Sequence, residues 1–438
     1  RDDTVLWLVN GVPSSLSRGA SKSFSFSVRQ EVSRRAQQAL GFRIAWRTIR
    51  DHWYDASLNG LDWNAVLQRY ESAAGRAVDG AVFDRIVEMM FGELNGSHLG
   101  FLPGTFFGNP PVVPWRDETA HLGLVFDPFH EGAGWLVAHA IDRSPADRHD
   151  ADLRPGDLIL AVDGTVVTSE MDPTEVLNGD LNREIVLRIR RGQDQPVEKR
   201  LRPISYADAR RLRHEEDVRE NHRRVEKVSG GKIGYVHVAH MQWPDFEQFE
   251  EEIHARGAGK DGLIIDVRDN GGGFTADHLL TVLCQPRHAW TVPRGGSPGY
   301  PGDRRVYASW DKPIVVLCNQ NSFSNAEIFT HAIKTLQRGK VVGVPTAGGV
   351  VSTGSASILD IGMMRMPTRG WYTLKEGEDM ELHPAVPDVV LWPAPGELPR
   401  GVDRQLDKAI AVLQSELKTA GALSPPELHP ASTRRAKP

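Results

Sequence analysis

The feature that most constrains the fold of this chain is a pair of apolar runs that each end in a sharp turn. The first run is Gly262–Arg268, which leads into Asn270-Gly-Gly-Gly-Phe274; the second is Pro313–Cys318, which leads into Asn321–Phe329. Continuous apolar runs of this length are typical of parallel strands that are buried on both faces, and a helical pattern follows each turn. The sequence therefore predicts a layer of alternating strands and helices.

Ser324 stands where the second turn opens the helix expected at Asn325–Leu336. A serine in the first turn of a helix lies at the positive end of the helix dipole. The glycines of the other turn can offer bare backbone N–H groups to a developing oxyanion. This combination indicates acyl transfer, and therefore a hydrolase with Ser324 as nucleophile. The alternative is that Ser324 only caps its helix.

The composition is that of an ordinary globular protein with several domains. The 438 residues exceed what one hydrophobic core holds, so roughly two to four domains are expected. A net charge of −5 without a long basic run argues against nucleic acid or an anionic membrane as partner, and no apolar stretch approaches the roughly 18 residues of a membrane span. Cys284 and Cys318 lie in apolar segments and are expected to be inert core thiols, as in a reducing compartment. Since no Cys and His residues have the spacing of metal ligands, we expect no metal and no cofactor.

The N-terminal part divides into a β segment and a helical segment. Residues 1–30 contain two short β patterns, and a hairpin of this kind needs a neighbour to pack against. Residues 31–116 are helical, and their last helix runs into Asn95-Gly-Ser-His98, where Gly96 fits a helix C-cap. His98 therefore stands just beyond a helix end. Taken alone, it would be a structural histidine.

Residues 117–205 resemble a PDZ domain in the order of their strands and in one motif. The motif is R-P-G-D-x-I-L-x-V-D-G, which lies within Leu153–Thr165. In PDZ domains an extended peptide adds to one strand beside a helix. Here the groove is expected between Leu122-Gly123-Leu124 and the helix near Pro173–Leu177. The alternative is a PDZ-shaped spacer that binds nothing.

Three further segments follow the PDZ-like region. Residues 206–230 are highly charged and predict a solvated connecting helix. Residues 231–420 carry the α/β pattern, and we expect Leu359–Met366 and Val389–Leu391 to add edge strands to its sheet. Residues 421–438 are expected to be a disordered tail.

A serine nucleophile needs a base, usually His or Lys, and a group that orients the base. In the carboxy-terminal processing proteases, which also carry a PDZ domain, the base is a lysine in a T-x-G-K element after the next strand. This chain resembles them but reads Thr346-Ala-Gly-Gly349 at that place. A Ser/Lys dyad is therefore disfavoured, and His98 is the best candidate for the base.

Several segments, taken together, resemble the C-terminal half of the tricorn protease family. In chain order they are Trp46–Tyr54, Gly60–Trp63, Gly92–His98, Ser229–Val238, Asp266–Phe274, the Ser324 turn, Thr346–Val350, and Met380-Glu381 ahead of Val386–Asp388. The resemblance covers residues 30–417. It implies a multidomain α+β and α/β protein with an N-terminal helical segment, a PDZ domain and a catalytic α/β sandwich of the ClpP/crotonase-like kind.

The resemblance also implies a catalytic Ser–His–Ser–Glu tetrad. Ser324 matches the nucleophile, and His98 matches the general base. Ser97 matches the residue that orients the imidazole, and Glu381 matches the carboxylate behind Ser97. Each of these residues alone has an ordinary structural interpretation; their joint occurrence supports the tetrad.

The oxyanion hole and the substrate contacts follow from the same resemblance. The backbone N–H of Asn325 and that of Gly273, or alternatively Gly272, are expected to bind the oxyanion, and Gly271 is expected to contact substrate. Family members carry an acidic residue, which selects a basic side chain, where this chain has Thr291. A small or apolar side chain is therefore expected there instead. The family's β-propellers precede this region, and residues 1–30 would be the end of a missing propeller.

We therefore expect a tricorn-like serine endopeptidase or oligopeptidase that hydrolyses unfolded peptides through an acyl-enzyme intermediate. By resemblance it would form a homo-oligomer, a hexamer, in the cytoplasm; a secretory signal upstream of Arg1 is the alternative. Two other functions stay open. One is a non-catalytic relative that binds a peptide or another ligand, and the other is a Ser/Lys tail-specific protease.

Overall fold

A computed structural model describes residues 4–29, 31–104, 118–286, 288–298, 307, 309–419 and 426–429. The chain divides into two compact units. Unit 1 comprises Arg1–Asn109 and Thr353–Arg369, and unit 2 comprises Pro110–Ser352 and Gly370–Pro438. The tail expected at residues 421–438 lies outside the described residues apart from 426–429. None of the helices in these ranges is both long and apolar enough to cross a membrane.

Unit 1 begins with a small antiparallel sheet of three strands. The first strand is as expected, but the second strand, expected at Ser23–Val28, is wrong: residues 24–28 form no strand, and the first strand pairs with Val12–Ser17 instead. The strands are β1 (Thr4–Val9), β2 (Val12–Ser17) and β3 (Ala20–Ser23). Leu6 and Leu8 of β1 are exposed although they are large and apolar. This sheet therefore buries little of its own apolar surface.

Three helices and a second sheet form the main core of unit 1. The helices are α1 (Arg34–His52), α2 (Trp63–Ala74) and α3 (Gly80–Gly92), and the strands are β4 (Gly100–Pro103), β17 (Ser352–Ile358) and β18 (Gly362–Arg369). Each helix begins at a side chain that accepts a backbone N–H: Ser33, Asp62 and Asp79. Buried residues from all three helices meet Phe101, Ile358 and Met364 of the sheet.

The placement of β18 corrects one prediction. Leu359–Met366 was expected at the edge of the α/β sheet, but β18 pairs with β4 of unit 1, with Met364 opposite Phe101. The alternation of buried and exposed residues predicts a strand without saying which strand it pairs with. Here the buried side chains of β18 complete the core beneath the helices of unit 1.

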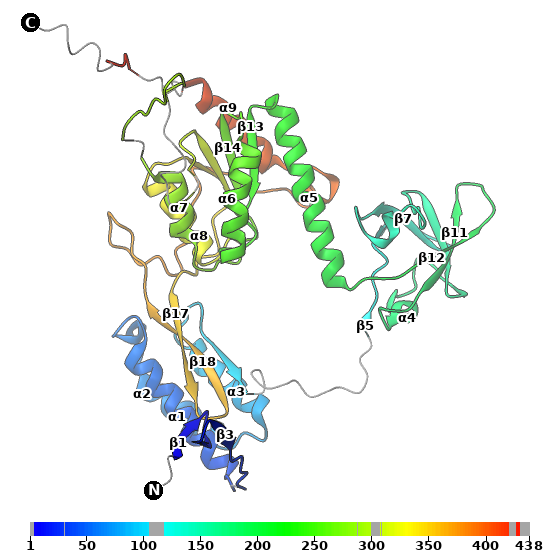
Figure 1. The fold of residues 1–438 in the computed structure, drawn as a ribbon. Coiled ribbons are helices and arrows are strands. Elements are labelled where there is room, and N and C mark those ends of the chain that lie inside the picture. The colour runs from blue at the N-terminus through cyan, green and yellow to red at the C-terminus, as the bar shows by residue number, and fades with distance from the viewer. Residues whose placement is uncertain are drawn as a thin grey trace, which may run out of the picture. The chain divides into compact units, whose positions relative to one another are not determined.

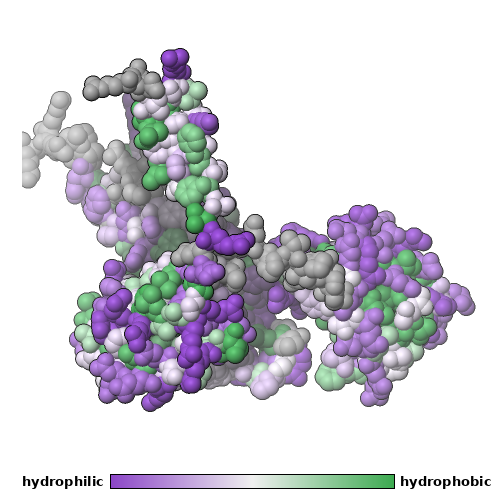
Figure 2. Space-filling view, turned by 90° about the horizontal axis from the view of Figure 1, so that it is seen from below, coloured by the Kyte–Doolittle hydropathy of each residue, from purple (hydrophilic) through white to green (hydrophobic). Residues whose placement is uncertain are grey.

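The PDZ domain, at the right of Figure 1, is built on one antiparallel sheet. Its strands, in spatial order, are β12 (Val197–Leu201), β11 (Ile185–Arg191), β8 (Asp157–Val162), β7 (Trp135–Ala140) and β6 (Leu124–Phe126). The short strand β9 (Thr165–Val166) pairs with β8, and α4 (Thr174–Leu177) is a single turn. In Figure 2 the surface of this domain, again at the right, is largely hydrophilic around a hydrophobic patch.

The charged segment after the PDZ domain forms α5 (Tyr206–Ser229). Ser205 caps its N-terminus, and Gly230 ends it with a positive φ of 62°. Ion pairs between residues four apart, such as Arg211 with Glu215, line the helix. Only a few of its residues, among them Val225, are buried, as a largely solvated helix requires.

The remaining part of unit 2 is a five-stranded parallel sheet covered on both faces by helices (Figure 1). Its strands, in order, are β13 (Ile233–His237), β14 (Gly262–Asp266), β15 (Ile314–Cys318), β16 (Lys340–Gly343) and β19 (Val389–Val390). One face packs against α6 (Trp243–Gly257), α7 (Ala276–Cys284) and α8 (Asn325–Thr335), and the other against α5 and α9 (Arg404–Thr419). Every residue of β14 and β15 is buried, as their apolar runs predicted. The expected mixed α/β multidomain fold with a PDZ domain is confirmed.

Candidate active site

Ser324 occupies the turn between β15 and α8 in a strained conformation. Its φ is 58° and its ψ is −119°, outside the regions that L-residues normally populate. The Ser324 N–H donates a hydrogen bond of 3.0 Å to Oε1 of Glu327, in the first turn of α8. Strain of this kind persists where the surroundings hold it, and it is typical of functional sites.

The glycine turn after β14 lies directly against the serine turn. A Cβ on Gly272 would be 2.6 Å from the Cβ of Ser324 and 3.0 Å from the backbone nitrogen of Asn325. The Phe323 N–H donates to the Asn270 carbonyl at 2.9 Å, and the Asn270 side chain donates to the Val238 carbonyl at 2.8 Å. Unit 2 therefore brings the two sequence-predicted turns together.

Two backbone N–H groups at this contact suit an oxyanion hole. Within the described part of the chain, neither the Asn325 N–H nor the Gly273 N–H donates a hydrogen bond to another residue. The Gly272 N–H, expected as an alternative donor, instead donates to Oδ1 of Asn270 at 2.9 Å. The Asn325 side chain has a task that the sequence did not suggest, because its Oδ1 accepts the Ala276 N–H at the start of α7 at 2.7 Å.

Two buried carboxylates hold the loop from Thr346 to Val351. Glu381 is 5% exposed, and its Oε2 accepts the N–H groups of Val350 and Val351 at 2.9 and 3.2 Å. It is thus a fixed acceptor and not the solvated loop residue that it would be on its own. Glu327 binds the preceding part of the loop. The Ser-x-x-Glu spacing of a capping box could have identified Glu327 from the sequence.

Ser97 and His98 lie in unit 1, just after α3. The Ser97 Oγ and the His98 Nδ1 are 2.6 Å apart, in hydrogen-bonding contact, and His98 has a positive φ of 59°. The preceding Gly96 packs against Trp53, since a Cβ there would be 2.6 Å from the indole ring. Ser324 and Glu381 belong to unit 2. The assembly of all four into one tetrad stays a prediction.

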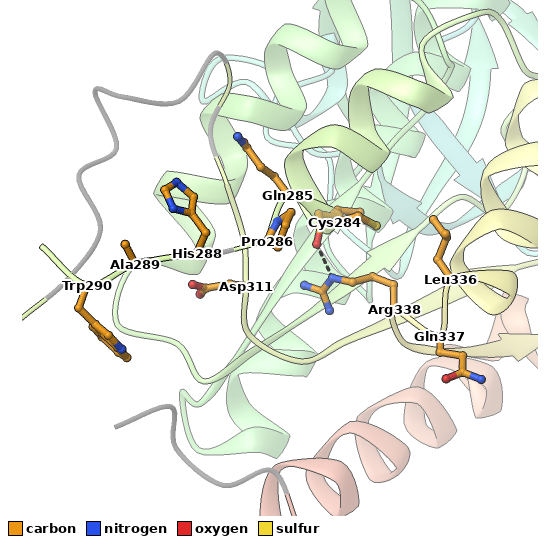
Figure 3. A pocket seen from close by; sticks show the side chains of 11 residues that line it. Cys284, Gln285, Pro286, His288, Ala289, Trp290, Asp311, Leu336, Gln337 and Arg338 are labelled. Carbon is orange, nitrogen blue, oxygen red and sulfur yellow. Dashed lines mark hydrogen bonds between the residues drawn. The ribbon is translucent and has the colours of Figure 1, made fainter. Parts of the chain in front are cut away.

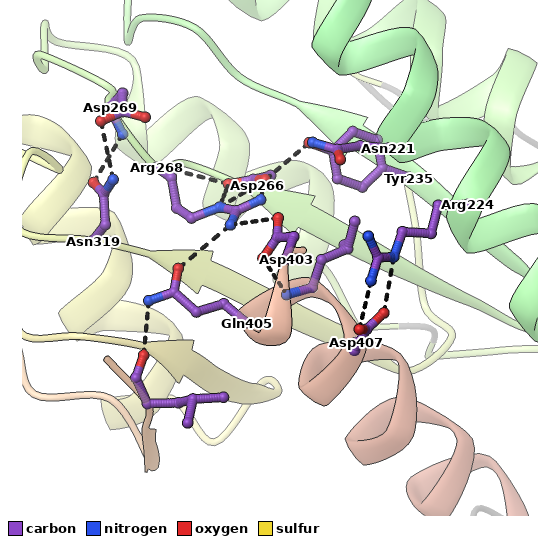
Figure 4. Close-up of polar contacts among 12 residues, drawn as sticks. Asn221, Arg224, Tyr235, Asp266, Arg268, Asp269, Asn319, Asp403, Gln405 and Asp407 are labelled. Atoms are coloured by element: carbon purple, nitrogen blue, oxygen red, sulfur yellow. Dashed lines mark hydrogen bonds and ion pairs between the residues drawn. The ribbon is translucent and has the colours of Figure 1, made fainter. Parts of the chain in front are cut away.

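A polar network supports the same turns from the side of α5 and α9 (Figure 4). Arg268 pairs with Asp266 at 2.6 Å and with Asp403 at 2.8 Å. Burial alone would raise the pKa of Asp266, but the Arg268 guanidinium lowers it overall. Next to this pair, Oδ1 of Asp269 accepts the side-chain amides of Asn319 and Asn321 at 3.0 and 2.7 Å. A cavity of about 580 Å³ lies over these groups.

A larger cavity, of about 700 Å³, lies at the other end of α7 and α8 (Figure 3). Trp290, Cys284 and Arg338 are among the residues that line it. Burial raises the pKa of the Cys284 thiol. The Arg338 guanidinium donates hydrogen bonds to the carbonyls of Trp310 and Lys312. Ser324 opens α8 whereas this cavity lies beyond its end, and the 11 residues of α8 span about 16 Å. The exposed Thr291 follows Trp290, and its part in substrate selection stays a prediction.

Comparisons with known proteins match three parts of the chain to described families. Residues 232–391 match Peptidase family S41, residues 36–92 the Tricorn protease C1 domain and residues 136–191 a PDZ domain. Tricorn protease homolog 1 of Streptomyces coelicolor is 31% identical over 92% of this chain, and the tricorn protease of Thermoplasma volcanium is 26% identical over 85%. Residues 232–391 thus belong to peptidase family S41, and the chain as a whole is similar to tricorn proteases.

A solved structure supports the fold of this tricorn-like chain. The crystal structure of the tricorn protease superposes with a TM-score of 0.73 at 24% identity, over 95% of this chain and 40% of that one. The chain spans only 37% of the Streptomyces relative and 36% of the Thermoplasma relative. Family S41 is a serine protease family, which agrees with the presence of a serine in the strained turn between β15 and α8.

The groove expected in the PDZ domain lies at the edge of its sheet, because β6 is the outermost strand on that side. Leu122 and Leu124 are buried in the domain core, so their side chains do not line a groove. The Gly123 N–H donates to Nδ1 of His121 at 2.9 Å, and burial lowers the pKa of that imidazole. Peptide contacts at Leu122, Gly123 and Leu124 would therefore have to use other backbone groups, and such binding stays a prediction.

Proposed function

We propose that this chain carries the catalytic part of a tricorn-like serine protease that hydrolyses peptide bonds of unfolded peptides. The observation that carries the proposal is the contact of Gly272 with Ser324 and Asn325, beside two backbone N–H groups that bind no other described residue. A nucleophile next to preorganised donors is the arrangement that acyl transfer needs. The relatives named above are called proteases, which makes peptides the expected substrates.

In the proposed reaction, Ser324 Oγ attacks the scissile carbonyl while His98 Nε2 takes the hydroxyl proton. The His98 Nδ1–H would donate to Ser97 Oγ, which is 2.6 Å away, and the Ser97 hydroxyl to Glu381. The oxyanion would accept the N–H groups of Asn325 and Gly273. The imidazolium then protonates the leaving amine, and water hydrolyses the acyl-enzyme by the same steps in reverse order.

Three finer features belong to the same proposal. Thr291 carries no charge, so we expect cleavage after small or apolar residues rather than after Lys or Arg. Whether the chain acts as an endopeptidase or an oligopeptidase depends on whether its active site binds internal bonds of long peptides or only bonds of short peptides. A homo-oligomer, a hexamer by resemblance, in the cytoplasm remains the expected setting.

The Ser/Lys alternative finds no support at its decisive position. Gly349 stands where the lysine would be, and its N–H donates to Glu327. The non-catalytic alternative would leave the Ser324 turn without a reason for its strained backbone.

The test is turnover of a panel of fluorogenic oligopeptides by the native chain and by Ser324→Ala and His98→Ala. We expect both variants to lose activity by about three orders of magnitude or more. Full activity of Ser324→Ala would exclude the mechanism, and full activity of His98→Ala would favour a base other than His98. Labelling of Ser324 by a fluorophosphonate separates an enzyme from a non-catalytic binder.

A further inference from the structure

We infer that Glu327 is a positioning residue for the nucleophile, an inference that rests on the proposed function of Ser324. The Glu327 side chain is 1% exposed and accepts four hydrogen bonds. Its Oε1 accepts the N–H groups of Ser324 and Gly349 at 3.0 and 2.8 Å. Its Oε2 accepts the Thr346 hydroxyl at 2.6 Å and the Gly348 N–H at 2.5 Å. One carboxylate thus joins the nucleophile turn to the loop that follows β16.

The bond to the Ser324 N–H acts directly on the strained residue. A φ of 58° with a ψ of −119° is unfavourable for a residue other than glycine, so other contacts must hold Ser324 in this conformation. Glu327 can do so because it is itself fixed in the first turn of α8. The oxyanion donor Asn325 lies between the two residues, so its N–H direction depends on the same contact.

The chemistry of the donors requires the ionised carboxylate. All four are N–H or O–H groups that need an acceptor, and no Lys, Arg or His in the described ranges forms an ion pair with Glu327. A glutamine has the same size but only one acceptor oxygen. If its oxygen replaced Oε1, the Gly348 N–H would lose its acceptor; if it replaced Oε2, the Ser324 and Gly349 N–H groups would lose theirs.

The loop carries the effect of Glu327 further. The next two residues, Val350 and Val351, donate their N–H groups to Glu381. Glu327 and Glu381 therefore bind consecutive parts of the same loop, Thr346–Val351, within unit 2. Moving Glu327 would displace both the nucleophile and the carboxylate proposed to stand behind Ser97.

The test compares the rate and the end point of fluorophosphonate labelling in the native chain, Glu327→Gln and Asp388→Asn. Asp388 is a matched control, because its carboxylate accepts the Val341 N–H at 2.8 Å in the same sheet, away from the nucleophile turn. We expect Glu327→Gln to label to the native stoichiometry but about 100-fold more slowly, as for the loss of one oxyanion donor. Asp388→Asn should label at the native rate.

A purely structural role would give another pattern: fewer reactive sites at the end point, each reacting at the native rate. That pattern, or a Glu327→Gln rate within threefold of the native one, would overturn the inference. If the native chain itself fails to label at Ser324, the proposed function fails, and the positioning role fails with it.

A second pair of variants covers the case in which Glu327→Gln does not fold. Thr346→Val removes one donor to Glu327, whereas Thr346→Ser keeps the hydroxyl. Slower labelling of the valine variant, with the native rate restored in the serine variant, supports the inference. Equal rates in both variants contradict it.

Discussion

Gly272 lies so close to Ser324 that a Cβ on the glycine would come within 2.6 Å of the serine Cβ. The same Cβ would be 2.7 Å from the Phe323 carbonyl oxygen. Gly272 also has a φ of 88°, which L side chains rarely adopt. Only a residue without a side chain lets the turn after β14 meet the turn after β15, so this glycine joins the two halves of the candidate site.

Gly272→Ala should therefore impair catalysis strongly. The added methyl group would push the Ser324–Asn325 backbone away from Gly273, and loss of one oxyanion donor typically lowers kcat by about 10²–10³. Peptide turnover measures the effect. The matched control is Gly80→Ala in α3, where a Cβ would meet nothing within 4 Å and no change in kcat is expected. Native kcat in Gly272→Ala would show that the close contact has no catalytic role.

Asn325 should matter for stability through its side chain. Its Oδ1 accepts the Ala276 N–H, an orphan donor at the start of α7. Asn325→Ala should lower the free energy of unfolding by about 0.5–2 kcal/mol, as for the loss of an N-cap, whereas Asn325→Asp keeps the acceptor and should retain stability. Chemical denaturation compares the three proteins. Equal destabilisation by Ala and Asp would mean that the Oδ1 contact contributes nothing.

Much of the fold could be predicted from the sequence because local patterns determine it. The buried runs of β14 and β15, the capped helices and the Arg-Pro-Gly-Asp turn of the PDZ domain all follow from residues close together in the chain. The Ser97–His98 contact is likewise local. By contrast, β18 pairs with β4 across a long stretch of sequence, and no local periodicity specifies such a partner.

The part of the site that the sequence did not predict depends on tertiary contacts. Glu327 sits in a helix, where a glutamate ordinarily faces solvent, yet its acceptors meet donors from the loop at Thr346–Gly349. The Gly272 N–H could be assigned only once Asn270 was seen to accept it. In both cases the unknown was the hydrogen-bond partner of a polar group, and the spacing of residues along the chain does not determine partners that tertiary contacts bring together.

Asp269 should support the nucleophile turn through its side chain. It accepts the amides of Asn319 and Asn321, which lie just before Ser324. Asp269→Ala removes both bonds and places alanine at a φ of 59°, so we expect kcat to fall by about tenfold, the equivalent of roughly 1.4 kcal/mol. Asp269→Asn keeps an acceptor oxygen and tolerates this backbone, and it should retain most activity. Steady-state kinetics measure kcat of both variants. Equal losses of kcat in Asp269→Ala and Asp269→Asn would contradict the role given to the acceptor oxygen of Asp269.

Asp84 in α3 should make unit 1 less stable at neutral pH. Burial raises its pKa from 3.8 to about 6, with smaller contributions from Glu88 and Asp79. Because the folded pKa lies above the unfolded one, the ionised carboxylate destabilises the fold, and this loss is complete above about pH 6. Asp84→Asn should then raise the free energy of unfolding at pH 7, by about 1 kcal/mol or less, because solvent screens the charge of this partly exposed carboxylate. The advantage should shrink as the pH falls from 6 to 4, where the native carboxyl becomes neutral. Urea denaturation of both proteins at pH 4, 5 and 7 measures it, and an advantage independent of pH would show that charge is not its cause.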